Sequence, residues 1–495
     1  MTNLPDPADP SSSHRYISNA GEDIREMLAT IGVDSIDRLF DTIPNDVKLK
    51  ELLDILGPWS EVETRRWFRD LAARNKTSID HLSFLGGGAY AHYQPSCVDH
   101  LIQRAEFLTA YTPYQPEVSQ GTLQSIFEYQ THQCLLTGLD VANASLYDGS
   151  TALCEAVLMA ERLSKGRKKV VLAKSIHPHY VQTVRTYIQN LGIEIVEVPW
   201  GDDGRVDLDA LRAACDGAFG VAVQSPNFFG VVEDYDAIAR ATEGITKIAV
   251  VAEATSFGIL TPPGEHGFDI CVGEGQAWGV PTQFGGPYVG FMVVRDALKR
   301  HMPGRLVGET VDVDGKRAYV LTLATREQHI RRGKATSNIC TNQALIALAA
   351  NIYLSLMGKQ GLHEVATQCL QKTAYLRSKL REIDGVELPF AGPVYNEFAV
   401  RTPFPAKEIL AGLEREKILG GIPLGWFFED RDRDFLVAVT ELHTREQLDR
   451  YAAALNAVIP SVARDPGGRS ARHEPIRATR APDPSLSLGM TGRAQ

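Results

Sequence analysis

The stretch 268–287, FDICVGEGQAWGVPTQFGGP, has the pattern of a buried strand that runs into a glycine-lined loop. A lysine in such a loop can form an imine with an aldehyde cofactor, because a deprotonated amine is a nucleophile. This chain has Gln276 there instead, and an amide nitrogen is conjugated and non-basic. The flanking lysines are Lys247 and Lys299, and Lys299 comes after the following strand, on an expected solvent-facing helix. The chain therefore has the loop and lacks the amine.

Two other positions have residue types that suit pyridoxal phosphate. The segment NASLYDGSTALCEA predicts a strand, a turn and a helix that begins near Ser150. Free N–H groups at a helix start, with the turn residues Gly149, Ser150 and Thr151, suit a phosphate, although Ser150 could simply cap the helix. Glu253 ends the predicted strand KIAVVAE, at the edge where open α/β sheets bind ligands. A carboxylate there can pair with a protonated pyridine nitrogen; the alternative is an acid that caps a nearby helix.

Two polar segments could contribute to a pocket or an interface. In 110–133, AYTPYQPEVSQGTLQSIFEYQTHQ, a proline-stiffened loop presents Tyr111, Tyr114 and Glu117. Such loops often line pockets, and ordinary tyrosine packing is the competing interpretation. The segment 323–343, LATREQHIRRGKATSNICTNQ, is basic within an acidic chain, and arginine forks suit carboxylate and phosphate. A ligand-facing or subunit-facing role is favoured over a plain surface loop for its candidates, which are Arg326, His329, Arg331 and Asn338.

The elements that must position these residues alternate between strands and helices over about 95–340. The predicted strands KVVLAK, IEIVEVP, GVAVQSPN and KIAVVAE are nearly all apolar and rich in β-branched residues. Such strands belong to a sheet that is buried on both faces and is largely parallel, with right-handed crossovers. The expected fold class is α/β, with a large, mostly parallel sheet domain, a smaller C-terminal α+β domain and an N-terminal helical arm.

Composition sets the expected domain boundaries. The glycine loop LGGGAY at 85–90 matches no nucleotide-binding pattern, so it receives no such role. The expected divisions are a disordered N-terminus (1–15), a helical arm (16–94), a large α/β domain (95–343), a small α+β domain (344–460) and a disordered tail (461–495).

Charge and cysteine content exclude several classes of function. The net charge of −10 argues against nucleic acid or an anionic membrane as a main partner. The seven cysteines form no Cys-x-x-Cys pair, which indicates reduced thiols, and no residues stand out as metal ligands. The N-terminus has no export signature and no window is long and apolar enough to cross a membrane, so a cytoplasmic location is expected.

Five segments together resemble one family, the P-protein of the glycine cleavage system. They are RYISNAGEDIREMLATIGVDSIDRLFDTIP, YTPYQPEVSQGTLQSIFEYQT, YDGSTALCEA, GEGQAWGVPTQFGGPYVG and TREQHIRRGKATSNICTNQ. The likeness covers about residues 15–455 and is to the half that many bacteria make as a separate α subunit. It implies the type I pyridoxal-phosphate-dependent transferase fold, which is the aspartate aminotransferase-like fold, and glycine dehydrogenase (aminomethyl-transferring, decarboxylating) activity.

The resemblance also implies a division of labour between two chains. A His-Lys pair in the homologous β subunit stands where this chain has Gly275–Gln276, so pyridoxal phosphate is expected on the partner, in an α2β2 assembly. Glycine is the implied substrate, and the aminomethyl group passes to the lipoyl arm of the H-protein. Tyr111, Tyr114 and Glu117 are expected to edge the channel for that arm. Arg326, His329 and Arg331 are expected to steer an anion or to hold the subunits together.

Two alternatives remain open. The chain could be a self-sufficient enzyme of the same fold that uses another lysine, for which Lys334 beside the arginines is the best candidate. It could also be a scaffold that has kept the fold without activity, because fold alone does not fix function.

Overall fold

The structure is a computed structural model of the chain, and it describes residues 19, 21–49, 59–164, 166–337, 339 and 341–464. These residues fall into two compact units, one that ends at Lys76 and one that begins at Thr77. Residues 1–15, which were expected to be disordered, lie outside the described residues, as do residues 465–495 of the expected tail.

The first unit is helical where it is described. Its elements are α1 (Glu22–Ile31), the 3₁₀ helix η2 (Ile36–Phe40) and α2 (Glu61–Ala72). The helix α1 ends at Gly32, which adopts a left-handed conformation and whose N–H bonds the carbonyls of Leu28 and Ala29. Ser60 and Glu63 form a reciprocal capping box that starts α2.

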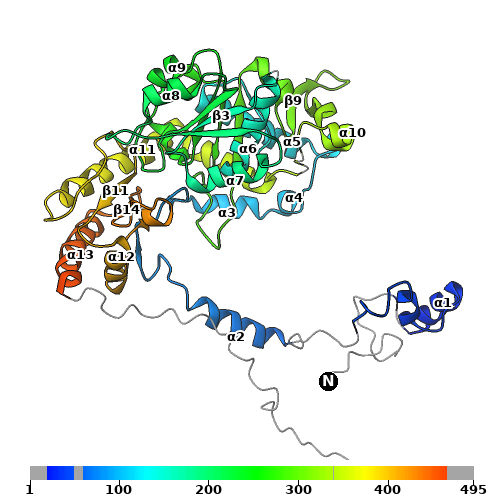
Figure 1. The fold of residues 1–495 in the computed structure, drawn as a ribbon. Coiled ribbons are helices and arrows are strands. Elements are labelled where there is room, and N and C mark those ends of the chain that lie inside the picture. Colours follow the sequence, from blue (N-terminus) through cyan, green and yellow to red (C-terminus); the bar gives the residue numbers. More distant parts are fainter. Residues whose placement is uncertain are drawn as a thin grey trace, which may run out of the picture. The chain divides into compact units, whose positions relative to one another are not determined.

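The second unit is organised around a seven-stranded sheet with the order β2-β8-β7-β6-β5-β3-β4 (Figure 1). Every neighbouring pair is parallel except those of β8, which is antiparallel to both β7 and β2. The strands are β2 (Val141–Ala142), β3 (Lys169–Ala173), β4 (Glu194–Val198), β5 (Gly220–Gln224), β6 (Thr246–Val251), β7 (Ile270–Glu274) and β8 (Gly290–Val294). The strand expected over NASLY is reduced to a single bridge between Leu146 and Gly290.

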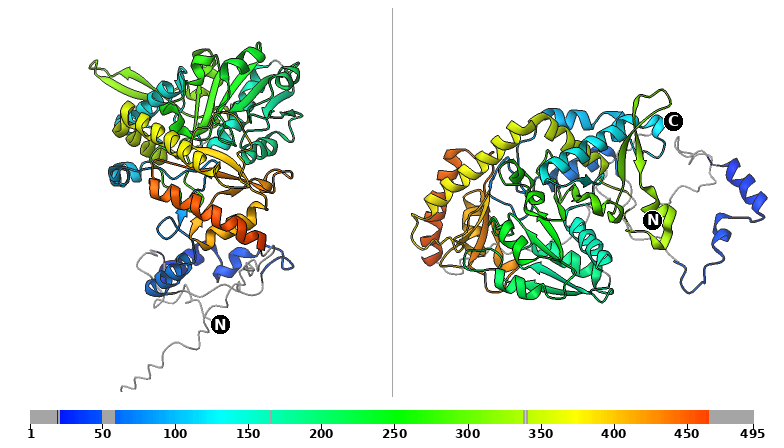
Figure 2. Two further views of the ribbon diagram at one scale, coloured as in Figure 1. Left: turned by 90° about the vertical axis from the view of Figure 1, so that its left-hand side faces the viewer. Right: turned by 90° about the horizontal axis from the view of Figure 1, so that it is seen from above.

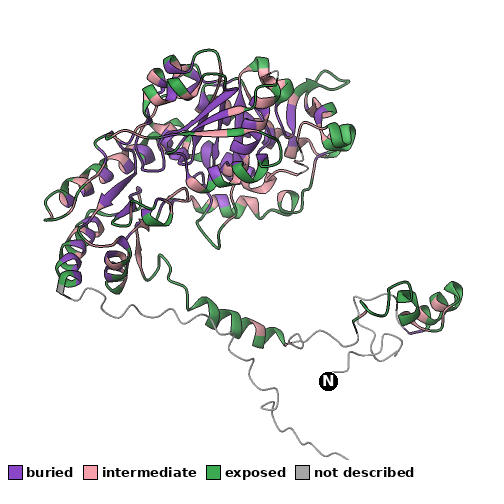
Figure 3. Cartoon of the chain, viewed as in Figure 1, coloured by how far each residue is buried: buried purple, intermediate pink, exposed green. Residues whose placement is uncertain are grey.

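Helices cover both faces of this sheet, so its apolar strands are buried, as Figures 2 and 3 show. The helices before and between the strands are α3 (Ser96–Ile102), α4 (Ala105–Leu108), α5 (Gln120–Thr137), α6 (Gly149–Leu163), α7 (Pro178–Ile188), α8 (Leu208–Ala214) and α9 (Tyr235–Ala241). After β8 come an antiparallel hairpin and a short helix, which are β9 (Leu306–Val311), β10 (Arg317–Thr322) and α10 (Gln328–Arg331). The expected α/β class with a large, mostly parallel sheet is confirmed.

A long helix, α11 (Ala344–Leu380), leads to the C-terminal part of the unit. It consists of two helical halves that meet at Gly358, whose dihedral angles are not helical. The first half packs into the core around the large sheet, and Leu376 and Leu380 pack into a second core. This second core surrounds β11 (Glu397–Arg401), α12 (Ala406–Arg415), β12 (Ile418–Leu419), β13 (Ile422–Pro423), β14 (Asp434–Ala438) and α13 (Arg445–Arg464).

Residues 82–93, here named the strap, belong to the larger unit and differ from the expected helical arm over 16–94. The strap begins with β1 (Leu82–Ser83), which pairs in parallel with β12. Phe84 is fully buried in the second core and its ring lies against Tyr451. Such a pairing joins residues more than three hundred positions apart in sequence, so local periodicity could not reveal it.

No helix within the described ranges combines the length and the apolar character that a membrane crossing requires.

A glycine at the junction of the two cores allows a stability test. Gly230 has φ +78°, and a Cβ there would lie 1.8 Å from the carbonyl oxygen of Glu397 on β11. We expect Gly230→Ala to lower the free energy of unfolding by about 3 kcal/mol or more, since both the backbone conformation and the contact become strained. The control Gly217→Ala has φ +68° with open space around it and should cost about 1 kcal/mol. Urea unfolding of both variants would contradict the claim if the two losses were equal.

Candidate functional site

Gln276 lies at the carboxyl edge of the sheet, two residues after the end of β7, and is 2% exposed. Its Oε1 accepts the backbone N–H of Tyr90 at 3.0 Å. Its Nε2 donates to the carbonyls of Tyr90 at 3.1 Å and Val280 at 2.6 Å. Both amide hydrogens and the amide oxygen are thus committed to main-chain groups, so Gln276 fastens the strap to the sheet edge.

The turn at the start of α6 is closed by its own residues. Asp148 caps the helix, because its carboxylate accepts the N–H of Thr151 at 2.8 Å and the hydroxyl of Ser150 at 2.6 Å. The hydroxyl of Thr151 also bonds back to Asp148. The helix cap is therefore Asp148 and not Ser150, because the Ser150 hydroxyl donates to Asp148 and accepts no helix N–H.

The N–H of Gly149 donates to a carboxylate that sequence reasoning did not single out, Glu274 at the end of β7, at 3.0 Å. Glu274 also accepts the N–H groups of Gln276 at 3.0 Å and Val289 at 2.9 Å, and it is 2% exposed. Burial raises the pKa of Glu274 to about 7, although these N–H donors act in the opposite direction. A carboxylate of the chain therefore takes the place where a cofactor phosphate would meet the helix.

Glu253 follows β6 and is 2% exposed. Its Oε1 accepts the N–H of Thr255 at 2.9 Å, so it caps the 3₁₀ helix η4 (Ala254–Gly258), as the alternative interpretation expected. Its Oε2 lies 3.1 Å from Nε2 of His92 and 3.4 Å from Nδ2 of Asn396. The carboxylate assigned to a pyridine nitrogen thus faces an imidazole of the same chain.

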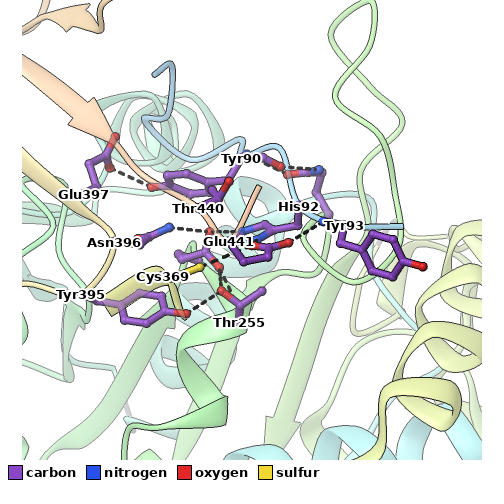
Figure 4. A network of polar contacts seen from close by, with 12 residues as sticks. Tyr90, His92, Tyr93, Thr255, Cys369, Tyr395, Asn396, Glu397, Thr440 and Glu441 are labelled. Atoms are coloured by element: carbon purple, nitrogen blue, oxygen red, sulfur yellow. Dashed lines mark hydrogen bonds and ion pairs between the residues drawn. The ribbon is translucent and has the colours of Figure 1, made fainter. Parts of the chain in front are cut away.

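His92, near the end of the strap, lies beside Glu441 (Figure 4), and its other ring nitrogen contacts the Glu253 carboxylate. Its Nδ1 lies 2.8 Å from Oε2 of Glu441, and Sγ of Cys369 lies 3.4 Å from the same oxygen. Burial opposes a charge on the ring, but the Glu253 carboxylate and the contacts with Cys369 and Glu441 raise the pKa of His92 well above its ordinary value. These residues come from four distant segments, so no spacing in the sequence could have identified them.

The residues present do not fit pyridoxal phosphate on this chain. Such a site needs an amine, an open phosphate cradle and a free carboxylate for the pyridine nitrogen. Here the three corresponding places are taken by the bonded amide of Gln276, by the Glu274 carboxylate and by the His92 imidazole. The arrangement can hold the strap and the sheet together, and it offers no nucleophile to a carbonyl.

Only some of the candidate residues in the segments 110–133 and 323–343 lie close to one another. Tyr114 lies beside His329, with ring centroids 6.0 Å apart, and its hydroxyl accepts from Nη2 of Arg305 at 3.3 Å. Tyr111 is 71% exposed, and its hydroxyl lies 3.3 Å from that of Thr341. Glu117, in the 3₁₀ helix η3 (Pro116–Val118), is exposed, and so are Arg331 and Lys334.

Arg326 is buried, and its position differs from that expected of a ligand-facing arginine. Its guanidinium donates to the main-chain carbonyls of Met302, Gly304 at 3.0 Å and Leu323 at 3.1 Å. It therefore ties together the chain on either side of the β9–β10 hairpin. Asn338 lies outside the described residues. Lys299 pairs with Asp296 at 2.6 Å and is partly exposed, away from the strap.

The raised pKa of Glu274 predicts how stability depends on pH. The native state holds this proton up to about pH 7, whereas an ordinary glutamate in the unfolded chain has a value of 4.5. The stabilisation is therefore fully present below the lower value and is lost as pH rises through 7, by about 3 kcal/mol in total. In urea titrations between pH 4.5 and pH 7.5, Glu274→Gln should flatten this fall, and the exposed control Glu265→Gln should not. Parallel profiles for Glu274→Gln and the unmodified chain would refute the assignment.

Comparison with known proteins agrees with this fold. The family described as "Glycine cleavage system P-protein" matches residues 14–455. A protein of Geobacillus thermodenitrificans named "Probable glycine dehydrogenase (decarboxylating) subunit 1" is 49% identical over 89% of this chain and 98% of its own length. One of the same name from Desulforamulus reducens is 48% identical over 90% of this chain and 100% of its own.

Solved structures extend the comparison. A crystal structure of glycine decarboxylase (P-protein) of the glycine cleavage system in inhibitor-bound form has a TM-score of 0.82, with 41% identity over 90% of this chain and 100% of that one. A sphingosine-1-phosphate lyase from Burkholderia pseudomallei, at 14% identity and a TM-score of 0.62, shares the fold alone. Because the family match spans nearly the whole described chain, this protein belongs to the glycine cleavage system P-protein family.

Proposed function

We propose that this chain is subunit 1 of a glycine dehydrogenase (decarboxylating) and that a homologous second subunit carries its pyridoxal phosphate. Relatives of this name align with the chain over 97–100% of their own length at 48–50% identity, so the likeness concerns whole subunits. The word "subunit" in that name also implies a second chain. The reaction is the decarboxylation of glycine, with transfer of the aminomethyl group to the lipoyl arm of the H-protein.

The observation that carries the proposal is that the groups at the expected cofactor positions of this chain are already bonded to one another. The amide of Gln276 is hydrogen-bonded to main-chain groups of Tyr90 and Val280. The Glu274 carboxylate accepts the N–H of Gly149 at the start of α6. The described loop after β7, residues 275–288, contains no lysine that could form an imine with an aldehyde. When bound to the partner, pyridoxal phosphate supplies the electron sink that decarboxylation of glycine needs. This chain then contributes its surfaces to the assembly, which we propose to be α2β2 and cytoplasmic.

The exposed residues of the loop 110–119 and of α10 are the proposed contact region for the partner or the lipoyl arm. Tyr111 and Glu117 are exposed, and Tyr114 and His329 form a ring pair held by Arg305. Exposed tyrosines give a large contact area with little loss of rotamer entropy, which suits a docking surface. Arg331, exposed on α10, offers a fork for an anionic group.

Reconstitution tests the division between subunits. We expect the purified chain to show no pyridoxal absorbance and no glycine–bicarbonate exchange, since it has no amine in the pocket. Both should appear after mixing with a homologous chain that has a His-Lys pair. Borohydride reduction in the presence of pyridoxal phosphate, followed by peptide mapping, should label the second chain. Exchange by this chain alone, or a stable label on Lys334, would instead support the self-sufficient enzyme.

A surface tyrosine tests the contact region. Tyr111→Ala removes a side chain that is 71% exposed and whose hydroxyl contacts that of Thr341, so the thermal midpoint should change little. The reconstituted enzyme should lose about tenfold in kcat/KM for lipoylated H-protein, which is the scale of one aromatic contact. The matched control Tyr187→Ala removes another partly exposed tyrosine, on α7. Equal effects of the two variants would remove the contact region from the proposal.

A further inference from the structure

We propose that His92, Cys369 and Glu441 form a binding site for one divalent transition-metal ion, and that Zn²⁺ is the ion they fit. The imidazole, thiolate and carboxylate that these residues offer are the three ligand types that Zn²⁺ takes in proteins. The inference concerns this chain's own side chains and does not depend on the proposed function. The sequence indicates no such site, because the ligands lie in the strap, in the middle of α11 and just after β14.

The distances between the three ligand atoms suit a tetrahedral ion. Nδ1 of His92 lies 2.8 Å from Oε2 of Glu441, Sγ of Cys369 lies 3.4 Å from that oxygen, and all three atoms lie within 4.8 Å of one another. Around tetrahedral Zn²⁺ the nitrogen–oxygen and sulfur–oxygen separations are roughly 3.3 and 3.5 Å, given ordinary bond lengths. The nitrogen–oxygen pair must therefore separate by about half an ångström, and the sulfur–oxygen distance already matches.

The contact on the other side of His92 prepares it as a ligand. Its Nε2 lies 3.1 Å from the Glu253 carboxylate, whose other oxygen accepts the N–H of Thr255 at 2.9 Å. A carboxylate accepts hydrogen bonds, so Nε2 carries the hydrogen in its contact with Glu253. Nδ1 is then the ring nitrogen that faces Glu441 and Cys369. Histidines that bind metals are commonly oriented in this way by a second carboxylate, which also increases their basicity.

Two buried polar atoms beside the cluster indicate room for a further ligand. Among the described residues, the Tyr353 hydroxyl and Oγ1 of Thr440 have no hydrogen-bond partner, and the residues are 0% and 3% exposed. Thr440 is the residue before Glu441, and Tyr353 lies on α11, the helix that also carries Cys369. Unpaired buried hydroxyls are costly and rare. A water molecule as the fourth ligand would give the Tyr353 hydroxyl a partner.

The net charge of the cluster allows a divalent ion to replace two protons. Without an ion, one proton lies in the contact between Nδ1 of His92 and Glu441, and one lies on the Cys369 thiol, which donates to the same carboxylate. A divalent ion replaces these two protons, which pass to solvent, and new bonds form to Nδ1, Sγ and the carboxylate. The net charge of the buried group is unchanged, so binding adds no uncompensated charge to the interior.

Metal uptake by the full-length chain tests the proposal. After treatment with a chelator and exchange into metal-free buffer, the chain should take up about one Zn²⁺ and should gain thermal stability as it does so. Co²⁺ in place of Zn²⁺ should produce a thiolate-to-cobalt charge-transfer band. Uptake far below one equivalent, or a cobalt complex without that band, would show that the cluster is a proton-sharing network alone and would overturn the proposal.

Four variants separate ligation from folding. Cys369→Ser should abolish the charge-transfer band. It should also weaken Zn²⁺ binding by more than the roughly 10- to 100-fold that is typical when a residue that only hydrogen-bonds a metal ligand is changed. Glu253→Gln, a positioning change, should weaken binding within that range and keep the band. Tyr353→Phe should keep the stoichiometry and weaken binding a few-fold.

The matched control is Cys271→Ser, which changes another buried cysteine, on β7. It should bind as the unmodified chain does. Should Cys369→Ser fold poorly, the band and the affinity of Glu253→Gln decide the question. Unchanged Zn²⁺ affinity in both of those variants would refute the site.

Discussion

The buried polar contacts of the strap hold the larger unit together, and the rest of the site depends on them. The strap pairs with β12 at one end, passes the carboxylate of Glu397 and reaches the sheet edge at Gln276. The Tyr90 hydroxyl donates to Glu397 at 2.8 Å, and the N–H of Gly87 donates to the same carboxylate at 2.7 Å. Such groups are stabilising only when every one is paired, because an unpaired buried donor or acceptor loses its hydration without compensation.

Two groups of this chain stand where the charged groups of a type I cofactor would lie. A carboxylate stands at the helix start where an anionic phosphate would bind, and an imidazole faces the carboxylate that would meet a pyridinium. The start of α6 and the Glu253 carboxylate therefore each have a polar partner from the protein itself. This accounts for how the sheet edge, with Glu253 and the start of α6, keeps its geometry without an amine.

The sequence predicted the architecture well and the site less well. Apolar, β-branched strands between amphipathic helices indicated a buried parallel sheet, and the structure contains it. The place of Gln276 at the end of β7 and of Glu253 at the end of β6 also followed from the strand pattern. Arg326 was expected at a ligand or an interface, but it is buried against carbonyls near the β9–β10 hairpin. Nothing local distinguishes an arginine that bonds the main chain from one that faces solvent.

What the sequence determined by itself is the fold class, the family resemblance and the absence of an amine at Gln276, because periodicity and residue type are local properties of the chain. What only the tertiary structure decided is which groups fill the vacated positions. His92 is more than two hundred positions from both Cys369 and Glu441. The three side chains meet because β1 pairs with β12 and α11 spans both cores. Contacts of that kind depend on chain pairing and packing, which a linear pattern does not encode.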